Sequence, residues 1–192
     1  GLDQYPEITP VIKEKEHKIN FGGLWHSDTA YEQTPPLGTM LYARELPPYG
    51  GDTEFSNMYL AYETLSNGMR ALLENLVAVN ISGKGRVQDT RAPMRGKAAT
   101  SAREDSFIAE HPVVRTHPET GRKSLYVNLA HTSHFKGMTV EESAPILDYL
   151  FQHQVKPEFT CRVKWEVGTL TFWDNPVSYT HLTLPTSGEV VG

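Results

Sequence analysis

The sequence predicts a mainly β fold with flanking helices, organised as one domain. Several stretches alternate between apolar and polar residues, as half-buried strands do, and turn signals separate them. The 192 residues include 15 glycines and 13 prolines, a proportion typical of short strands joined by turns. Hydrophobic residues make up 39% of the chain, which is enough for the core of one domain.

The clearest strand pattern covers residues 160–166, where Cys161, Val163 and Trp165 point to one face. A cysteine in such a strand is predicted to be a small core residue rather than a nucleophile. Trp173 is likewise predicted to be a core aromatic residue. The weaker strand candidates are residues 39–44, 76–81, 112–116, 124–128 and 169–173.

Two helical patterns interrupt the strands. Ser66 precedes apolar residues that recur at helical spacing over residues 69–76. A second helix is predicted after Thr139, because Thr139 and Glu142 have the spacing of a capping box. Pro145 fits poorly beyond the first turn, so the regular part of this helix is expected to begin later.

Composition excludes several classes of protein. The net charge of −5 argues against a generically basic nucleic-acid binder, and no apolar run is long enough for a membrane span. The single cysteine, Cys161, excludes an internal disulfide and a cysteine-based zinc cluster, which predicts a reducing, cytoplasmic location. Residues 83–105 are locally basic, and we interpret them as a solvated loop or as a lid over an anionic ligand.

The His26-Ser27-Asp28 stretch carries the strongest chemical signal. On an extended segment, residues i and i+2 point to the same face, so His26 and Asp28 direct an imidazole and a carboxylate into one space. These groups are two of the three ligands of the 2-His-1-carboxylate triad that binds Fe(II). A hydrogen-bonded surface pair is the alternative that this short pattern leaves open.

An ordered set of further motifs accompanies this pair. They include Gly-Gly-Asp-Thr at residues 50–53, Leu-Tyr-Val-Asn at 125–128 and Phe-Trp-Asp-Asn at 172–175. Linking segments at residues 25–29, 35–36, 41–44 and 157–162 belong to the same set. In order, spacing and flanking residues, the chain resembles the TauD/TfdA family, the taurine-dioxygenase-like enzymes that depend on Fe(II) and 2-oxoglutarate.

The resemblance implies a double-stranded β-helix, or jelly roll, that is incomplete at both ends of this chain. It implies that His26 and Asp28 bind iron and that Thr53 contacts the carboxylate of 2-oxoglutarate. Tyr126 and Asn128 are expected to line the substrate pocket or, equally, to pack in a core strand. The implied activity is hydroxylation of a small organic substrate by O₂, with release of succinate and CO₂, in a homo-oligomer.

The chain departs from the family pattern after the Trp-Asp-Asn stretch. Pro176 stands where the family has an arginine, Thr180 where it has the second iron histidine, and His181 comes one residue late. The later arginine that pairs with 2-oxoglutarate is absent as well. Because a one-residue slip on a strand reverses the side-chain direction, we interpret His181 as a chance histidine that does not replace the missing iron ligand.

Residues 177–187 resemble one translated reading frame of a sequencing-library adapter. We therefore expect a partial dioxygenase domain over residues 1–176 and a non-native tail over 177–192, with a divergent natural terminus as the rival interpretation. The initial Gly1, in place of Met, also suggests a piece of a longer protein. On this interpretation the polypeptide as written is expected to be inactive or a poor catalyst.

Two other functions remain open from the sequence. One is a non-catalytic jelly-roll binding module that has lost its iron, and the other is a zinc hydrolase, for which no general base is evident. The remaining histidines have no spacing that matches a ligand pair, and we predict them to be surface groups or partly buried, hydrogen-bonded ones. They are His111, His117, His131, His134 and His153.

Overall fold

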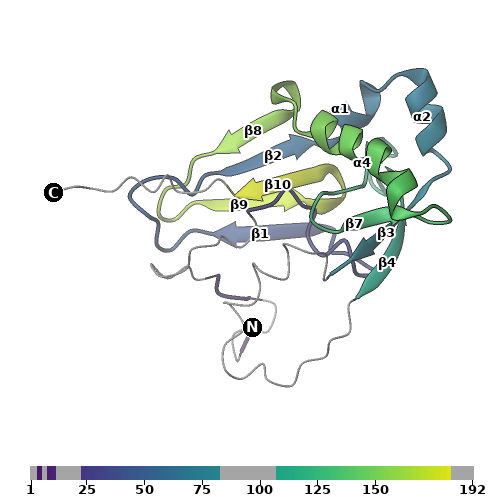
Figure 1. Cartoon of the computed structure of the whole chain (residues 1–192). Coiled ribbons are helices and arrows are strands. Elements are labelled where there is room, and N and C mark those ends of the chain that lie inside the picture. Colours follow the sequence, from purple (N-terminus) through teal and green to yellow (C-terminus); the bar gives the residue numbers. More distant parts are fainter. Residues whose placement is uncertain (1–3, 6–7, 12–22, 83–106, 183–192) are drawn as a thin grey trace.

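The computed structural model describes residues 4–5, 8–11, 23–82 and 107–182, and this part of the chain is mainly β with a few helices (Figure 1). The strands are β1 (Gly38–Tyr42), β2 (Thr53–Asn57), β3 (Val77–Ile81), β4 (Ile108–Pro112), β5 (Val114–Thr116), β6 (Lys123–Leu125), β7 (Thr132–Phe135), β8 (Thr160–Val163), β9 (Leu170–Asp174) and β10 (Ser178–Leu182). The helices are α1 (Met58–Glu63), α2 (Asn67–Leu73), α4 (Val140–Gln154) and the 3₁₀ turns η2 (Pro157–Phe159) and η3 (Asn175–Val177).

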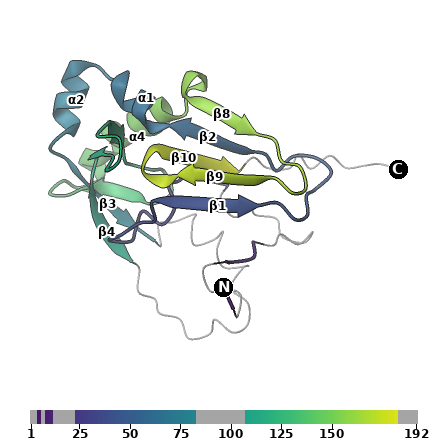
Figure 2. The same ribbon diagram turned by 180° about the vertical axis from the view of Figure 1, so that it is seen from behind.

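The strands form small antiparallel sheets. Their orders are β1-β9, β10-β2-β8, β4-β3-β7 and β5-β6. In both views the strands of the first two sheets run alongside each other, while α1, α2 and α4 gather at one end (Figures 1 and 2). The turn η3 carries the chain from β9 in one sheet to β10 in the other.

The hydrophobic core lies where the helices meet the strands. Tyr179 of β10 is fully buried in it, so this strand contributes both to a sheet and to the core. The other large, fully buried apolar members are Met58, Leu73, Val113, Leu125, Val127, Phe135 and Leu150. Among the residues that the structure describes, no helix is both long and apolar enough to cross a membrane.

Both predicted helices are present. The Ser66 side chain caps α2 by accepting a hydrogen bond from the Met69 amide, and Thr139 forms the predicted capping box with Glu142. The expectation that the second helix begins later was wrong, because α4 runs without interruption from Val140 through Pro145. Proline forfeits one helical hydrogen bond here, and the capping box together with two buried leucines offsets that cost.

All six predicted strands appear with shifted ends, as β1, β3, β5, β6, β8 and β9. The prediction that Cys161 is a core residue was wrong, since the residue is exposed. Its strand, β8, is the last in the order β10-β2-β8, and the alternating pattern alone does not show which strand lies at an edge. Trp173 is half-buried rather than a core residue, and the basic segment 83–105 lies outside the described residues.

Candidate metal centre

A backbone bridge to β10 fixes the position of His26. The His26 amide donates to the Thr180 carbonyl at 3.0 Å, and the Thr180 amide donates back to the His26 carbonyl at 2.8 Å. The two residues are therefore directly opposite each other in an antiparallel pair, where side chains point to the same face. This bridge places residue 180 as the cross-strand neighbour of the predicted ligand.

The His26 ring leaves one nitrogen lone pair unsatisfied by the protein. Its Nδ1 lies 2.7 Å from the Leu24 carbonyl oxygen, which only accepts, so Nδ1 carries a proton. In the neutral ring Nε2 then has only a lone pair, and it faces Asp28 Oδ1 at 3.2 Å. Two acceptors at this distance need a shared cation, either a proton or a metal ion. The side chains are 17% and 21% exposed, so the pair is accessible.

Asp28 is held in its ionised form. Burial alone raises the pKa of this carboxyl, but the His26 side chain and the hydrogen bond from the Thr39 hydroxyl lower the pKa below its usual value overall. The Thr39 hydroxyl lies 2.8 Å from Asp28 Oδ2, leaving Oδ1 as the oxygen that faces His26. An ionised carboxylate beside an imidazole lone pair is the donor chemistry that suits Fe(II).

The described residues supply two ligands of a triad and no third. Within the described ranges, no group of three His, Cys, Asp or Glu residues is placed to hold a metal ion. Thr180 lies opposite His26, whereas the His181 ring stacks on Trp25 with centroids 5.2 Å apart. His26 and Asp28 therefore fit a divalent metal, but the donor set is incomplete.

Thr53 begins β2 and is buried. Its hydroxyl accepts a hydrogen bond from the Trp165 indole at 2.9 Å. Because an indole N–H only donates, the hydroxyl proton of Thr53 is still available for a carboxylate. The side chain thus keeps the donor capacity that the predicted role requires.

Tyr126 and Asn128 follow β6 and are both buried. The Arg115 guanidinium lies 4.3 Å from the centroid of the Tyr126 ring. Burial raises the pKa of the Tyr126 hydroxyl, Arg115 opposes that rise, and the charge of Asp28 adds to it. Asn128 instead accepts a hydrogen bond from the His131 amide at 2.8 Å, as a turn residue does.

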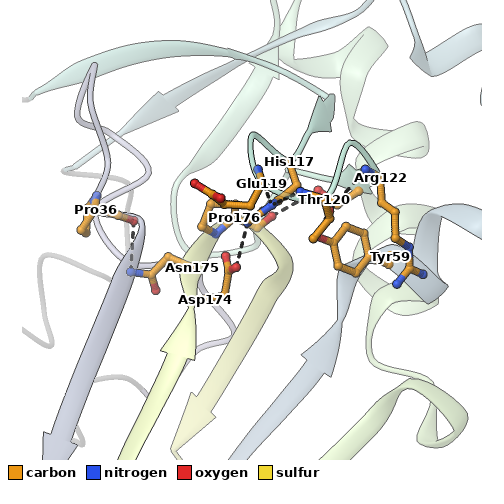
Figure 3. A network of polar contacts seen from close by, with 10 residues as sticks. Pro36, Tyr59, His117, Glu119, Thr120, Arg122, Asp174, Asn175 and Pro176 are labelled. Atoms are coloured by element: carbon orange, nitrogen blue, oxygen red, sulfur yellow. Dashed lines mark hydrogen bonds and ion pairs between the residues drawn. The ribbon is translucent and has the colours of Figure 1, made fainter.

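A second histidine–carboxylate pair was not predicted (Figure 3). His117 is buried, its Nδ1 accepts from the amides of Glu119 and Thr120, and its Nε2 lies 2.8 Å from Asp174 Oδ2. The His-Pro-Glu-Thr-Gly sequence at 117–121 is typical of a turn, but it does not indicate this partner. Of the histidines without a ligand spacing, His111, His131 and His153 are buried as well, in keeping with the partly buried alternative.

A paired imidazole and carboxylate on an antiparallel β fold supplies two of the three ligands of the 2-His-1-carboxylate triad, which is typical of non-haem Fe(II) oxygenases. Residues 3–177 match the family described as "Taurine catabolism dioxygenase TauD, TfdA family". The chain belongs to this family.

Individual relatives agree with that assignment. An alpha-ketoglutarate-dependent 2,4-dichlorophenoxyacetate dioxygenase of Burkholderia sp. (strain RASC) is 38% identical, over 79% of this chain and 50% of its own length. A taurine dioxygenase structure from Burkholderia xenovorans superposes with a TM-score of 0.69 and 35% identity, over 83% of this chain and 50% of that one. The structure of AAD-2 in complex with Mn(II) and N-oxalylglycine gives a TM-score of 0.72 at 30% identity, over 85% and 57% of the two chains. The chain spans about half the length of the curated relatives it matches.

Proposed function

We propose that residues 1–176 form part of an Fe(II)- and 2-oxoglutarate-dependent dioxygenase that hydroxylates a small organic substrate, releasing succinate and CO₂. The observation that carries this proposal is the opposition of His26 Nε2 and Asp28 Oδ1 at 3.2 Å, in a chain of the TauD/TfdA family. A double-stranded β-helix is the finer architecture we propose for its antiparallel sheets. The substrate itself is not specified by the described residues.

Each site residue has a role that its surroundings support. His26 and Asp28 would hold the metal, which when bound supplies the activation of O₂ that amino-acid side chains do not provide. Thr53 would donate its hydroxyl proton to a carboxylate of 2-oxoglutarate. The Mn(II) and N-oxalylglycine in the AAD-2 structure support this pair of partners for the family fold. Tyr126 would line the pocket near Asp28, whereas Asn128 supports the adjoining turn.

The chain as given is proposed to be inactive or poorly active. The positions expected for the second iron histidine and for an arginine are occupied by Thr180 and Pro176. The family match ends at residue 177, where the proposed non-native tail begins, although residues 178–182 of that tail pair with β2 as β10. We also propose a cytoplasmic location from the single cysteine, and the expected homo-oligomer stays a prediction.

Anaerobic addition of Fe(II) and saturating 2-oxoglutarate tests the proposal. We expect Thr180→His to show a visible charge-transfer band that the parent shows weakly or not at all, because the variant restores the third ligand opposite His26. Thr180→His combined with His26→Ala is the matched control and should lose the band. A folded Thr180→His chain with no band, and no succinate in air, would contradict the proposal and favour a binding module without metal.

A further inference from the structure

The Thr39 hydroxyl lies between the Asp28 carboxylate and an amide from the other end of the chain. Thr39 Oγ1 is 2.8 Å from Asp28 Oδ2, and Asn175 Nδ2 is 2.7 Å from the same Thr39 oxygen. Thr39 belongs to β1, and Asn175 begins η3 directly after β9, the partner strand of β1. The three side chains thus form a continuous hydrogen-bonded line that ends on a predicted metal ligand.

The direction of these hydrogen bonds follows from the groups around Asn175. Its Nδ2 also lies 3.3 Å from the Pro36 carbonyl oxygen, as Figure 3 shows, and that oxygen only accepts. The amide nitrogen rather than the amide oxygen must therefore face both Pro36 and Thr39. Thr39 accepts from Asn175, so its single hydroxyl proton is directed to Asp28 Oδ2.

The backbone fixes the start of this line. The Asn175 amide donates to the Leu37 carbonyl at 2.9 Å, and the side chain of Asn175 is almost fully buried. The preceding residue, Asp174, is tied to the buried His117 ring (Figure 3). Burial and these hydrogen bonds hold Asn175 in place as the donor at the start of the line.

We propose that Asn175 and Thr39 are positioning residues that orient Asp28, a role that rests on the proposed metal site. Because Thr39 occupies Oδ2, the carboxylate keeps Oδ1 turned to His26 Nε2 and binds a metal through one oxygen. Removing a hydrogen bond that orients a metal ligand in this way commonly weakens metal binding by about 10- to 100-fold. The sequence separates Thr39 and Asn175 by 136 positions, so no local motif indicates the pairing.

The first test uses the metal-free, full 192-residue chain. Three-bond couplings measured by NMR should show one χ1 rotamer for Asp28 in the parent and in Thr39→Ser, which keeps the hydroxyl. Thr39→Val should show averaged rotamers. Thr169→Val is the matched control, because Thr169 is also half-buried and hydrogen-bonded, at the far end of the same two strands. A single Asp28 rotamer in a folded Thr39→Val chain would overturn the proposal.

The second test is a Co(II) titration of the Thr180→His chain, which carries the proposed third ligand, followed by the metal's visible absorption. We expect Thr39→Val to weaken binding about 10-fold, Thr39→Ser to restore it, and Thr169→Val to leave it unchanged. Asn175→Asp should weaken binding as well, because a carboxylate accepts the Thr39 proton and diverts it from Asp28. If Thr39→Val fails to fold, Asn175→Asp carries the same test.

The double variant Thr39→Val with Asn175→Asp tests whether Asn175 and Thr39 act on Asp28 together. We call the hydrogen-bonded line from Asn175 through Thr39 to Asp28 a relay if the two effects depend on each other. Members of one relay should be non-additive, so the double variant should bind Co(II) no more weakly than Thr39→Val alone. Additive losses would overturn the relay. Absence of Co(II) binding by Thr180→His would instead contradict the proposed metal site, while the Asp28 rotamers would still decide whether the relay positions the carboxylate.

Discussion

The part of the chain that the structure describes contains two histidine–aspartate pairs, which differ in the hydrogen-bond partners of their imidazole nitrogens. In the His117–Asp174 pair, Nδ1 accepts two backbone amide protons and Nε2 lies 2.8 Å from the carboxylate, so both nitrogens have protein partners. In the His26–Asp28 pair, Nδ1 donates to a carbonyl and Nε2 presents its lone pair to a carboxylate oxygen. Both pairs bring an imidazole and a carboxylate together, but only in the second does an imidazole lone pair face the carboxylate oxygen.

The difference shows how a structural pair can be distinguished from a candidate metal pair. The His117 ring is 3% exposed and joins the turn after β5 to the end of β9. The His26 ring is 17% exposed and stands opposite Thr180, the position at which the second iron histidine is expected from the sequence. Satisfied hydrogen bonds together with burial indicate a role in folding, whereas an accessible lone pair indicates a role in binding.

The largest expected effect is on folding. His117→Ala removes a buried ring, its bond to Asp174 and the acceptor for two amides, so we expect a loss of about 3 kcal/mol in the free energy of unfolding. Urea denaturation measures this loss. His134→Ala is the matched control, since His134 is only half-buried and bonds to the neighbouring Ser133 side chain. A loss below about 1 kcal/mol for His117→Ala would contradict the structural role.

The second effect is on metal binding. Thr180→His adds an imidazole opposite His26 and should tighten Co(II) binding about 100-fold, since one ligand contributes roughly a quarter of the binding free energy of a four-ligand site. Isothermal titration calorimetry measures the change in Kd. His181→Ala is the control and should leave Kd unchanged, because that ring stacks on Trp25. If His181→Ala instead weakened Co(II) binding about 100-fold, His181 would be a metal ligand.

The sequence predicted the parts of the site that depend on local geometry. The His26–Asp28 pairing follows from an i, i+2 spacing, and the Thr139 capping box follows from an i, i+3 spacing. The positions of strands β1 and β9 were also predictable, because the alternation of apolar and polar residues is a local property of the sequence.

The rest depends on contacts between distant segments. The bond between His117 and Asp174 spans 57 positions, and no local pattern signals it. The exposure of Cys161 depends on the place of β8 in its sheet, which the pattern of one strand does not contain. The orientation of Thr180 toward His26 was anticipated only through the family pattern, and the bridge between them supplies its geometry.

A third effect concerns buried histidines that have no carboxylate partner. Burial lowers the pKa of His111 from its ordinary 6.5, although a hydrogen bond to the Glu32 carbonyl partly opposes this shift. Burial likewise lowers the pKa of His153, opposed by its bond to the Ala61 carbonyl. Below pH 6.5 the unfolded chain therefore binds more protons than the folded chain, and stability should fall until the folded pKa values are reached.

Chemical denaturation between pH 7.5 and 5 measures this loss, which we expect to be under about 1 kcal/mol per histidine. His111→Gln keeps a donor for the Glu32 carbonyl but does not titrate, so it should flatten the pH dependence. His134→Gln serves as the control and should leave the parent's slope intact. A steeper loss on acidification in His111→Gln would reverse the assigned sign.

The smallest effect on stability is expected at the candidate metal pair itself. His26→Ala removes a partly exposed ring with one carbonyl partner, so the metal-free chain should change by less than about 1 kcal/mol in its free energy of unfolding. The same variant should lose the rise in Tm that Co(II) produces in Thr180→His, because a metal stabilises only the state that binds it. His117→Ala should do the opposite, lowering the metal-free Tm while keeping the rise with Co(II). If both variants lowered the metal-free Tm equally, an unsatisfied lone pair would not distinguish a binding histidine from a structural one in this fold.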